Sequence, residues 1–148
     1  MAKPFPGVTP KVSPEALALG QHAWAPRVVV ADDDPRCRAA LQRSLTHLGF
    51  RVVPAEDGYA ALQTIRRHGA DALLTDLIMP HMDGPELLLR VSLVAPWVRC
   101  VAMTGAAPSE PRLISARERG ALETLRKPFS LEQLETVLWR ALRRPSAP

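Results

Sequence analysis

The feature that most constrains the fold is a repeated alternation of short apolar runs with longer amphipathic stretches, beginning at Arg27. Each short run has the length and aliphatic character of a buried strand, and each longer stretch carries apolar residues at helical spacing. The predicted strands are RVVVA (27–31), RVVPA (51–55), DALLT (71–75), VRCVAMT (98–104) and ALETL (121–125). The predicted helices lie within residues 34–49, 57–69, 84–95, 109–120 and 130–144.

Strands that alternate with helices favour a parallel sheet, because right-handed crossover connections place helices on both of its faces. We therefore expect an α/β fold: a doubly wound, five-stranded parallel sheet with five helices, and we take 2-1-3-4-5 as the working strand order. The chain of 148 residues is long enough for one such domain and its core.

Polar side chains stand at the carboxyl ends of four of the five predicted strands. They are Asp32, Asp33 and Asp34 after the first strand, Asp76 after the third, Thr104 after the fourth and Lys127 after the fifth. In a sheet of order 2-1-3-4-5 these four strands are neighbours, and such sheets bind ligands at this edge. The sequence therefore predicts one polar site that combines acids, a hydroxyl and an ammonium group.

Carboxylates this close together cannot all stay ionised without a counter-charge, so either one pKa rises or a cation binds. Oxygen ligands without a nearby histidine or cysteine favour Mg²⁺. Acids at strand ends also serve as helix caps, a role that suits Asp34 because a proline follows it. We assign Asp34 mainly to capping, whereas capping does not account for Asp32 and Asp33 together with Asp76 and Lys127.

Four segments in this order and spacing make the chain resemble the receiver domain of two-component response regulators, which is CheY-like and flavodoxin-like in fold. They are VVVADDDPRCRAAL, ALLTDLIMPHMDG, CVAMTGA and LRKPF, and the resemblance covers residues 27 to about 143. It implies that Asp76 accepts a phosphoryl group from a histidine of a sensor kinase or phosphotransfer protein. It also implies that Mg²⁺ is held by Asp32, Asp33, Asp76 and the backbone carbonyl of Ile78. Thr104 and Lys127 would contact the phosphoryl oxygens.

A carboxylate can attack phosphorus and form an acyl phosphate, and the charge of the transition state is stabilised mainly by cations. We therefore expect no enzyme activity beyond Mg²⁺-dependent self-phosphorylation and autodephosphorylation at Asp76. The added phosphoryl charge would draw the Thr104 hydroxyl inward, so movement of its loop is the expected switch.

Two features depart from the family pattern. Many receivers place a Tyr or Phe three residues before the lysine, whereas this chain has Thr124 there. We therefore expect a different or weaker readout on the face of the fourth helix, fifth strand and fifth helix. Ile78 and Ala106, two residues after Asp76 and Thr104, are apolar and cannot position an attacking water. Autodephosphorylation should therefore be slow.

The rest of the chain suggests how the domain is used. Residues 1–26 hold five prolines and are expected to be an extension or interdomain linker, followed by the receiver domain at 27–144 and a tail at 145–148. No output module follows, so we expect signalling by contact with an unknown downstream protein. No export signal or membrane span is visible, which predicts a cytoplasmic protein without a membrane partner.

Four alternatives remain open from the sequence. One is a receiver-like scaffold that is never phosphorylated, which the intact acids, Thr104 and Lys127 disfavour. The chain could be the receiver portion of a hybrid histidine kinase or larger regulator. A haloacid-dehalogenase-like phosphatase also uses a strand-end aspartate with Mg²⁺, but it needs Thr or Val where Arg36 stands, and a cap insertion that this chain lacks. The net charge of +4 raises nucleic-acid binding through WRALRR (139–144), although the other arginines are scattered and we expect no nucleic-acid partner.

Overall fold

The computed structural model describes residues 25–105 and 110–144 and shows one parallel sheet. Its strands are β1 (Arg27–Ala31), β2 (Arg51–Ala55), β3 (Ala72–Asp76), β4 (Arg99–Thr104) and β5 (Ala121–Arg126). They are arranged in the order β2-β1-β3-β4-β5. The predicted fold class and strand order are therefore confirmed. The expectations for residues 1–24, Ala106 and the tail at 145–148 lie outside the described residues.

Five helices connect and follow the strands. They are α2 (Pro35–His47), α3 (Gly58–His68), α4 (Gly84–Val94), α5 (Pro111–Glu118) and α6 (Leu131–Arg143). Each begins close to its predicted start, and most differences lie at the ends. The third strand runs one residue later than predicted, so that Asp76 is its last residue instead of following it.

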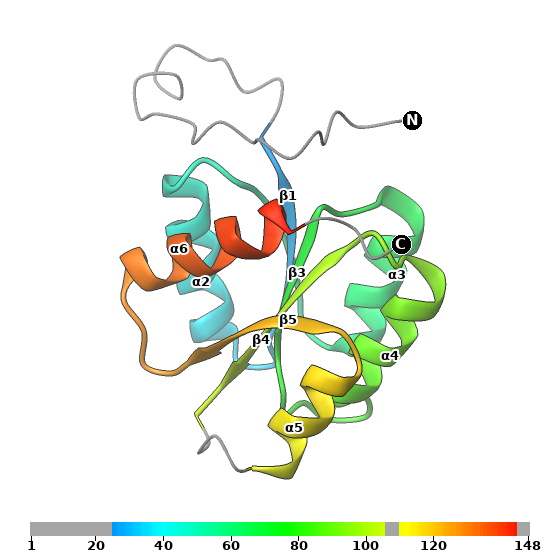
Figure 1. Ribbon diagram of the computed structural model, residues 1–148. Coiled ribbons are helices and arrows are strands. Elements are labelled where there is room, and N and C mark those ends of the chain that lie inside the picture. The colour runs from blue at the N-terminus through cyan, green and yellow to red at the C-terminus, as the bar shows by residue number, and fades with distance from the viewer. Residues whose placement is uncertain (1–24, 106–109, 145–148) are drawn as a thin grey trace.

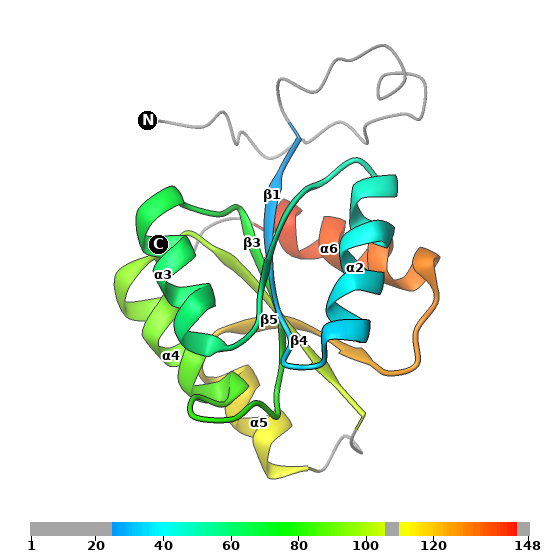
Figure 2. The same ribbon diagram turned by 180° about the vertical axis from the view of Figure 1, so that it is seen from behind.

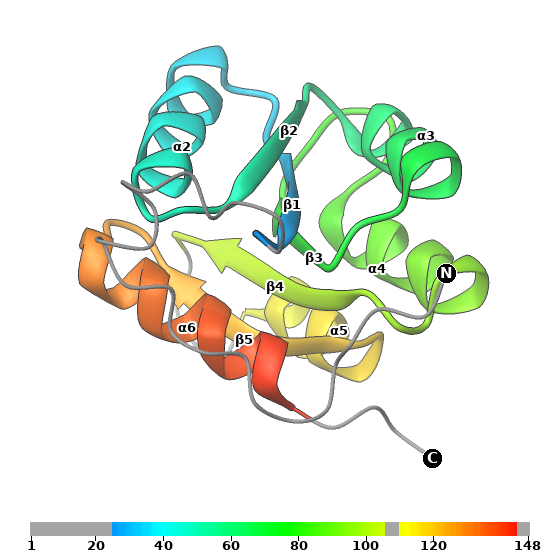
Figure 3. The ribbon, with the colours of Figure 1, turned by 90° about the horizontal axis from the view of Figure 1, so that it is seen from above.

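The helices form two layers on opposite faces of the sheet. Helices α2 and α6 lie on one face, and α3, α4 and α5 lie on the other (Figure 1), as the view from behind also shows (Figure 2). Seen from above, the twisted sheet separates the two groups (Figure 3). None of the helices in the described ranges is long and apolar enough to cross a membrane.

The core is divided by the alternation of side chains along each strand. In β1, Val28 and Val30 join the cluster beneath α2 and α6, while Val29 and Ala31 join the cluster beneath α3, α4 and α5. All four are fully buried. A strand covered on both faces is apolar in its interior, and the polar residues of this segment accordingly stand at its start, Arg27, and just after its end, Asp32.

Acidic N-caps fix where the strand-to-helix turns end. Asp34, Asp57 and Asp83 each accept a hydrogen bond from a backbone N–H at the start of α2, α3 and α4. Such a cap stabilises a helix by ~1 kcal/mol relative to alanine. The capping role predicted for Asp34 is confirmed, since its Oδ1 lies 2.8 Å from the amide nitrogen of Arg36.

Candidate functional site

The strand ends bring four of the predicted site residues to one edge of the sheet. Asp32 directly follows β1, Asp76 ends β3, Thr104 ends β4 and Lys127 directly follows β5. The last two are joined through the backbone, because the amide of Lys127 donates to the carbonyl of Thr104 at 2.7 Å. The strand order thus places residues that lie far apart in the sequence in one site.

Three carboxylates meet at this edge. One oxygen from each of Asp32, Asp33 and Asp76 lies within 4.8 Å of the others. Asp32 is buried, with 1% of its surface exposed, whereas Asp76 is half-buried and Asp33 is exposed. The site is therefore closed at its base and open to solvent above it.

Backbone amides hold two of these carboxylates in place. The amide of Asp34 donates to Oδ1 of Asp32 at 2.9 Å, and the amide of Leu77 donates to Oδ1 of Asp76 at 2.8 Å. The guanidinium of Arg38 donates to the carbonyl of Asp32 at 2.7 Å and fixes the loop between β1 and α2. The carboxylates are therefore oriented before any ligand arrives.

Lys127 is the cation that the acids share. Its Nζ lies 3.3 Å from Oδ2 of Asp32 and 3.2 Å from Oδ2 of Asp76. Burial raises the pKa of Asp32 above its ordinary value, a shift that the Asp34 amide and the charge of Lys127 only partly offset. Burial alone would lower the pKa of Lys127, but the charges of Asp76 and Asp32 outweigh it and raise this pKa. The lysine therefore stays protonated at neutral pH.

The donor set suits a hard divalent cation. Three carboxylate oxygens converge, one of them on a buried side chain whose charged form is disfavoured by desolvation, and a single ammonium group balances them. Oxygen-only ligands of this kind are those that Mg²⁺ takes in proteins. The acidic cluster could therefore bind such an ion. Ile78 lies two residues beyond Asp76 in the loop after β3, with 64% of its surface exposed.

Gly84 is a positioning residue that the sequence reasoning did not identify. A Cβ atom at Gly84 would lie 2.5 Å from the carbonyl oxygen of Asp76 and 2.7 Å from Cα of Leu77. The amide of Gly84 donates to the carbonyl of Leu77 at 2.9 Å. The loop after β3 therefore folds back directly onto Asp76, which only glycine permits. The sequence feature that could have identified Gly84 is the Asp83-Gly84 pair at the start of α4.

The two threonines of interest lie in different surroundings. Thr104 is buried, with 5% of its surface exposed. Thr124 lies in β5, and its Oγ1 accepts a hydrogen bond from Nη2 of Arg117 on α5 at 3.4 Å. The position at which many receiver domains, which the sequence resembles, carry an aromatic ring therefore holds a small side chain that is tied to α5.

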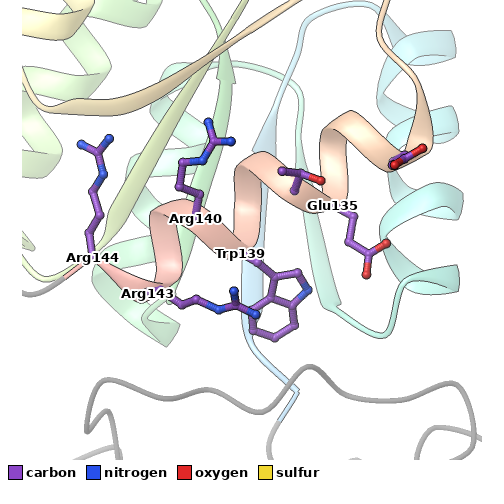
Figure 4. A pocket seen from close by; sticks show the side chains of 7 residues that line it. Glu135, Trp139, Arg140, Arg143 and Arg144 are labelled. Carbon is purple, nitrogen blue, oxygen red and sulfur yellow. The ribbon is translucent and has the colours of Figure 1, made fainter.

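The arginine cluster at the end of α6 is largely occupied by contacts within the chain. Figure 4 shows Trp139, Arg140, Arg143 and Arg144 projecting from the end of α6, where Trp139 is buried and the arginines are exposed. Arg140 and Arg144 pair with Glu123 of β5 at 3.6 and 2.9 Å, and the Arg143 guanidinium lies 5.9 Å from the Trp139 ring centroid. Glu123 therefore partly balances the charge of Arg140 and Arg144.

Curated proteins that match the chain include response regulators. Response regulator MprA of Mycobacterium sp. (strain KMS) is 35% identical over 120 residues, which cover 81% of this chain and 52% of that protein. The chain therefore spans about half the length of the curated relatives it matches.

Solved structures of receiver domains share the fold. Chemotaxis protein CheY4 of Vibrio cholerae superposes with a TM-score of 0.75 at 27% identity, over 80% of this chain and 99% of that one. The receiver domain of sensor histidine kinase PA1611 from Pseudomonas aeruginosa PAO1 gives a TM-score of 0.74 at 24% identity. The superposition covers 82% of this chain and 100% of that one. The latter structure has a magnesium ion coordinated in its active site cleft.

A sequence model of one family matches most of the chain. The family is described as the response regulator receiver domain, and the match covers residues 28–138. This range includes every strand and helix described above except the first residue of β1 and the last five residues of α6. The chain therefore belongs to the response regulator receiver domain family of two-component signalling.

Proposed function

We propose that this domain is a phosphoacceptor in which Asp76 receives a phosphoryl group from a histidine of a sensor kinase or phosphotransfer protein. One observation carries the proposal: the half-buried Asp76 carboxylate stands at the open edge of the sheet between two further acids and Lys127. A carboxylate in this position is accessible to a donor from solvent and is surrounded by groups that can balance phosphoryl charge.

In the proposed step, an Asp76 oxygen forms a bond to phosphorus while the phosphorus–nitrogen bond of phosphohistidine breaks. The imidazole leaves with the electron pair and then takes up a proton. Lys127, which now neutralises Asp32 and Asp76, would donate to the phosphoryl oxygens, and the Thr104 hydroxyl would follow as charge accumulates. Mg²⁺ bound by Asp32, Asp33, Asp76 and the carbonyl of Ile78 would neutralise charge on the transferred group.

An apolar groove beside the site supports docking of a helical donor protein. The groove of about 490 Å³ runs between α2 and the loop from β5 to α6. Cys37, Leu41, Phe129 and Leu134 line it, and Lys127 stands at its edge. A helix laid in this groove would hold a phosphohistidine close to Asp76.

We propose that the signal passes by protein contact and without an aromatic rotamer switch. The Arg117–Thr124 hydrogen bond ties β5 to α5, and Thr124 has no ring that could carry a shift of Thr104 to that face. A chemical-shift map of the phosphorylated domain should then show changes concentrated around the site. Large shifts across α5, β5 and α6 would contradict this.

The setting of the domain in a cell is also part of the proposal. The chain is either a stand-alone receiver or the receiver portion of a larger regulator or hybrid kinase. Both settings are compatible with a match that covers 52% of response regulator MprA. Cys37 and Cys100 are free thiols, which suits the reducing cytoplasm.

The test is incubation with acetyl phosphate and Mg²⁺, read by intact mass. The wild type should gain one phosphoryl group that hydroxylamine removes, and Asp76→Asn should gain none. Asp57→Asn is the matched control, because it replaces an N-cap acid by another capping residue away from Lys127. An unmodified wild type, or an adduct that persists in Asp76→Asn, would overturn the assignment.

A further inference from the structure

Thr75 is a buried polar residue to which the proposed phosphoryl transfer gives no role. In the part of the chain that the structure describes, the buried polar or charged residues are Asp32, Asp71, Thr75 and Thr104. Asp32 and Thr104 belong to the site, and Asp71 accepts a hydrogen bond from the amide of Arg27 at 2.7 Å. Thr75 is fully buried in β3, one residue before the proposed phosphoacceptor. Its hydroxyl therefore needs an explanation of its own.

The surroundings of Thr75 are those of a purely apolar strand. β3 reads Ala-Leu-Leu before it, and its partners across the sheet are Ala31 of β1 and Ala102 of β4, all of them fully buried. Valine has nearly the shape of threonine and suits a buried strand, whereas a buried hydroxyl costs free energy unless it is hydrogen-bonded. The threonine therefore matters for the hydrogen bond that its hydroxyl makes.

The Thr75 hydroxyl binds the peptide group that holds the Asp76 carboxylate. Oγ1 of Thr75 donates to the carbonyl oxygen of Asp76 at 2.9 Å. That carbonyl and the amide of Leu77 belong to one planar peptide group. The amide of Leu77 in turn donates to Oδ1 of Asp76 at 2.8 Å. One rigid plane thus accepts a hydrogen bond from Thr75 and donates another to the phosphoacceptor.

The same peptide group is held from the loop side. A Cβ atom at Gly84 would lie 2.5 Å from the Asp76 carbonyl oxygen, so the first residue of α4 packs directly against it. The pairing of β3 with β1 ends at Thr75, whereas its pairing with β4 continues to Asp76. The Thr75 hydroxyl and Gly84 therefore hold the Asp76 carbonyl at the point where pairing with β1 stops.

We propose that Thr75 is a positioning residue for the Asp76 carboxylate. Its hydroxyl fixes the rotation of the peptide group between Asp76 and Leu77, and the Leu77 amide then fixes Oδ1. Oδ2 is left facing the Lys127 ammonium group, 3.2 Å away. Since Thr75 is fully buried, it acts only through this peptide group. The role rests on the proposed function, in which Asp76 is the phosphoacceptor.

The rate of phosphoryl transfer depends steeply on the orientation of the acceptor. The attacking oxygen must lie in line with the bond that breaks, and a displacement of about 1 Å can slow a reaction roughly 10²-fold. If the peptide group turned, the Leu77 hydrogen bond would break and both Asp76 oxygens would move. The Thr75 hydroxyl should therefore affect the rate of phosphorylation beyond any effect on stability.

The first experiment separates the hydroxyl from the shape of the side chain. Thr75→Val keeps the branched shape and removes the hydroxyl, whereas Thr75→Ser keeps the hydroxyl and removes a methyl group. The rate of adduct formation with acetyl phosphate and Mg²⁺ should fall at least about tenfold in Thr75→Val and stay close to the wild-type rate in Thr75→Ser. A merely structural role would not be rescued by serine.

Val29→Ala is the control for lost stability. Val29 is fully buried in β1, on the face of the sheet to which Leu73 and Thr75 also point. Its truncation should lower the urea midpoint of unfolding without slowing phosphorylation. Circular dichroism should show that the three variants are folded.

The second experiment needs no phosphodonor. Hydrogen exchange of the Leu77 amide, followed by NMR, should be slow in the wild type and in Thr75→Ser, and about tenfold faster in Thr75→Val. If the wild type gains no phosphoryl group, the proposed function fails, and this measurement still decides the role of Thr75. A wild-type rate of phosphorylation in Thr75→Val, an equal loss in Thr75→Ser or unchanged Leu77 exchange in Thr75→Val would overturn the proposal.

Discussion

The Nζ atom of Lys127 lies 3.2 Å from Oδ2 of Asp76, although 51 positions separate the two residues in the sequence. The same ammonium group lies 3.3 Å from Oδ2 of Asp32. One cation is thus shared by the proposed phosphoacceptor and by a buried acid beside it. This shared ion pair leads to the first prediction.

Replacing Lys127 by Met should slow phosphorylation of Asp76 roughly 10²-fold, because the transferred group loses a charged hydrogen-bond donor. The measurement is the rate of adduct formation with acetyl phosphate at fixed Mg²⁺. Arg126→Met is the control, since Arg126 is the neighbouring cation on β5 but its side chain is exposed. Equal losses in the two variants would show that the effect is only one of net charge.

Magnesium should stabilise the fold through the acidic cluster. At a free Mg²⁺ concentration ten times the Kd, the free energy of unfolding should rise by ~1.4 kcal/mol. Asp33→Asn should remove most of this gain at little cost to the metal-free protein, because the side chain is exposed. Asp34→Asn should keep the gain, since Asn can still cap α2. Thermal unfolding with Mg²⁺ and with EDTA measures this gain in each variant. If Asp33→Asn and Asp34→Asn lost the gain equally, the assignment of Asp33 as a ligand would be contradicted.

Gly84→Ala should destabilise the domain by about 2 kcal/mol, because the added Cβ would overlap the backbone of Asp76 and Leu77. It should also slow phosphorylation, since the loop must move away from Asp76. Gly105→Ala is the stability control, because a Cβ there meets nothing within 4 Å. The urea midpoints of the two variants are compared, provided that their m-values are unchanged. Similar midpoints would refute the close approach of Gly84 to the backbone of Asp76.

Ile78→Glu should hasten decay of the acyl phosphate by at least about tenfold, because a carboxylate beside the phosphoryl group can orient and deprotonate water. Ile78→Leu keeps an apolar side chain at the same exposed position and should leave the decay slow. The decay is followed by intact mass after the phosphodonor is removed. Rapid decay in the wild type would contradict the role given to Ile78.

The thiols of Cys37 and Cys100 should differ in reactivity, and Cys100 should make the free energy of unfolding depend on pH. Burial raises the pKa of the Cys100 thiol to about 12 from 9.0. In the unfolded chain this thiol ionises near pH 9, so the stability it contributes is complete below that pH and is lost as pH rises toward 12. The loss approaches ~1.4 kcal/mol per pH unit.

Urea unfolding under reducing conditions at pH 8, 9 and 10 tests this contribution. The free energy of unfolding should fall less steeply with pH in Cys100→Ala than in the wild type. In the native protein, a thiol reagent at pH 8 should modify the half-buried Cys37 and spare Cys100 until the chain unfolds. Parallel pH profiles, or early labelling of Cys100, would refute the prediction.

The sequence by itself determined the secondary structure and the parallel α/β class of this domain. Runs such as RVVVA and helical spacings such as that of Leu41, Leu45 and Leu48 are local patterns, and local patterns follow from backbone and side-chain geometry. Asp34 could likewise be assigned from its neighbours alone, since a cap bonds only to residues two or three positions away. The same patterns indicated which strand ends carry acids.

Only the tertiary structure decided the distances and exposures on which the chemistry depends. The burial of Asp32, the position of Lys127 between two acids and the contact of Gly84 with Asp76 join residues from different strands and loops. The full burial of Thr75 likewise depends on where the sheet and the neighbouring helices lie. These properties arise from packing across the sheet, and no local periodicity contains them.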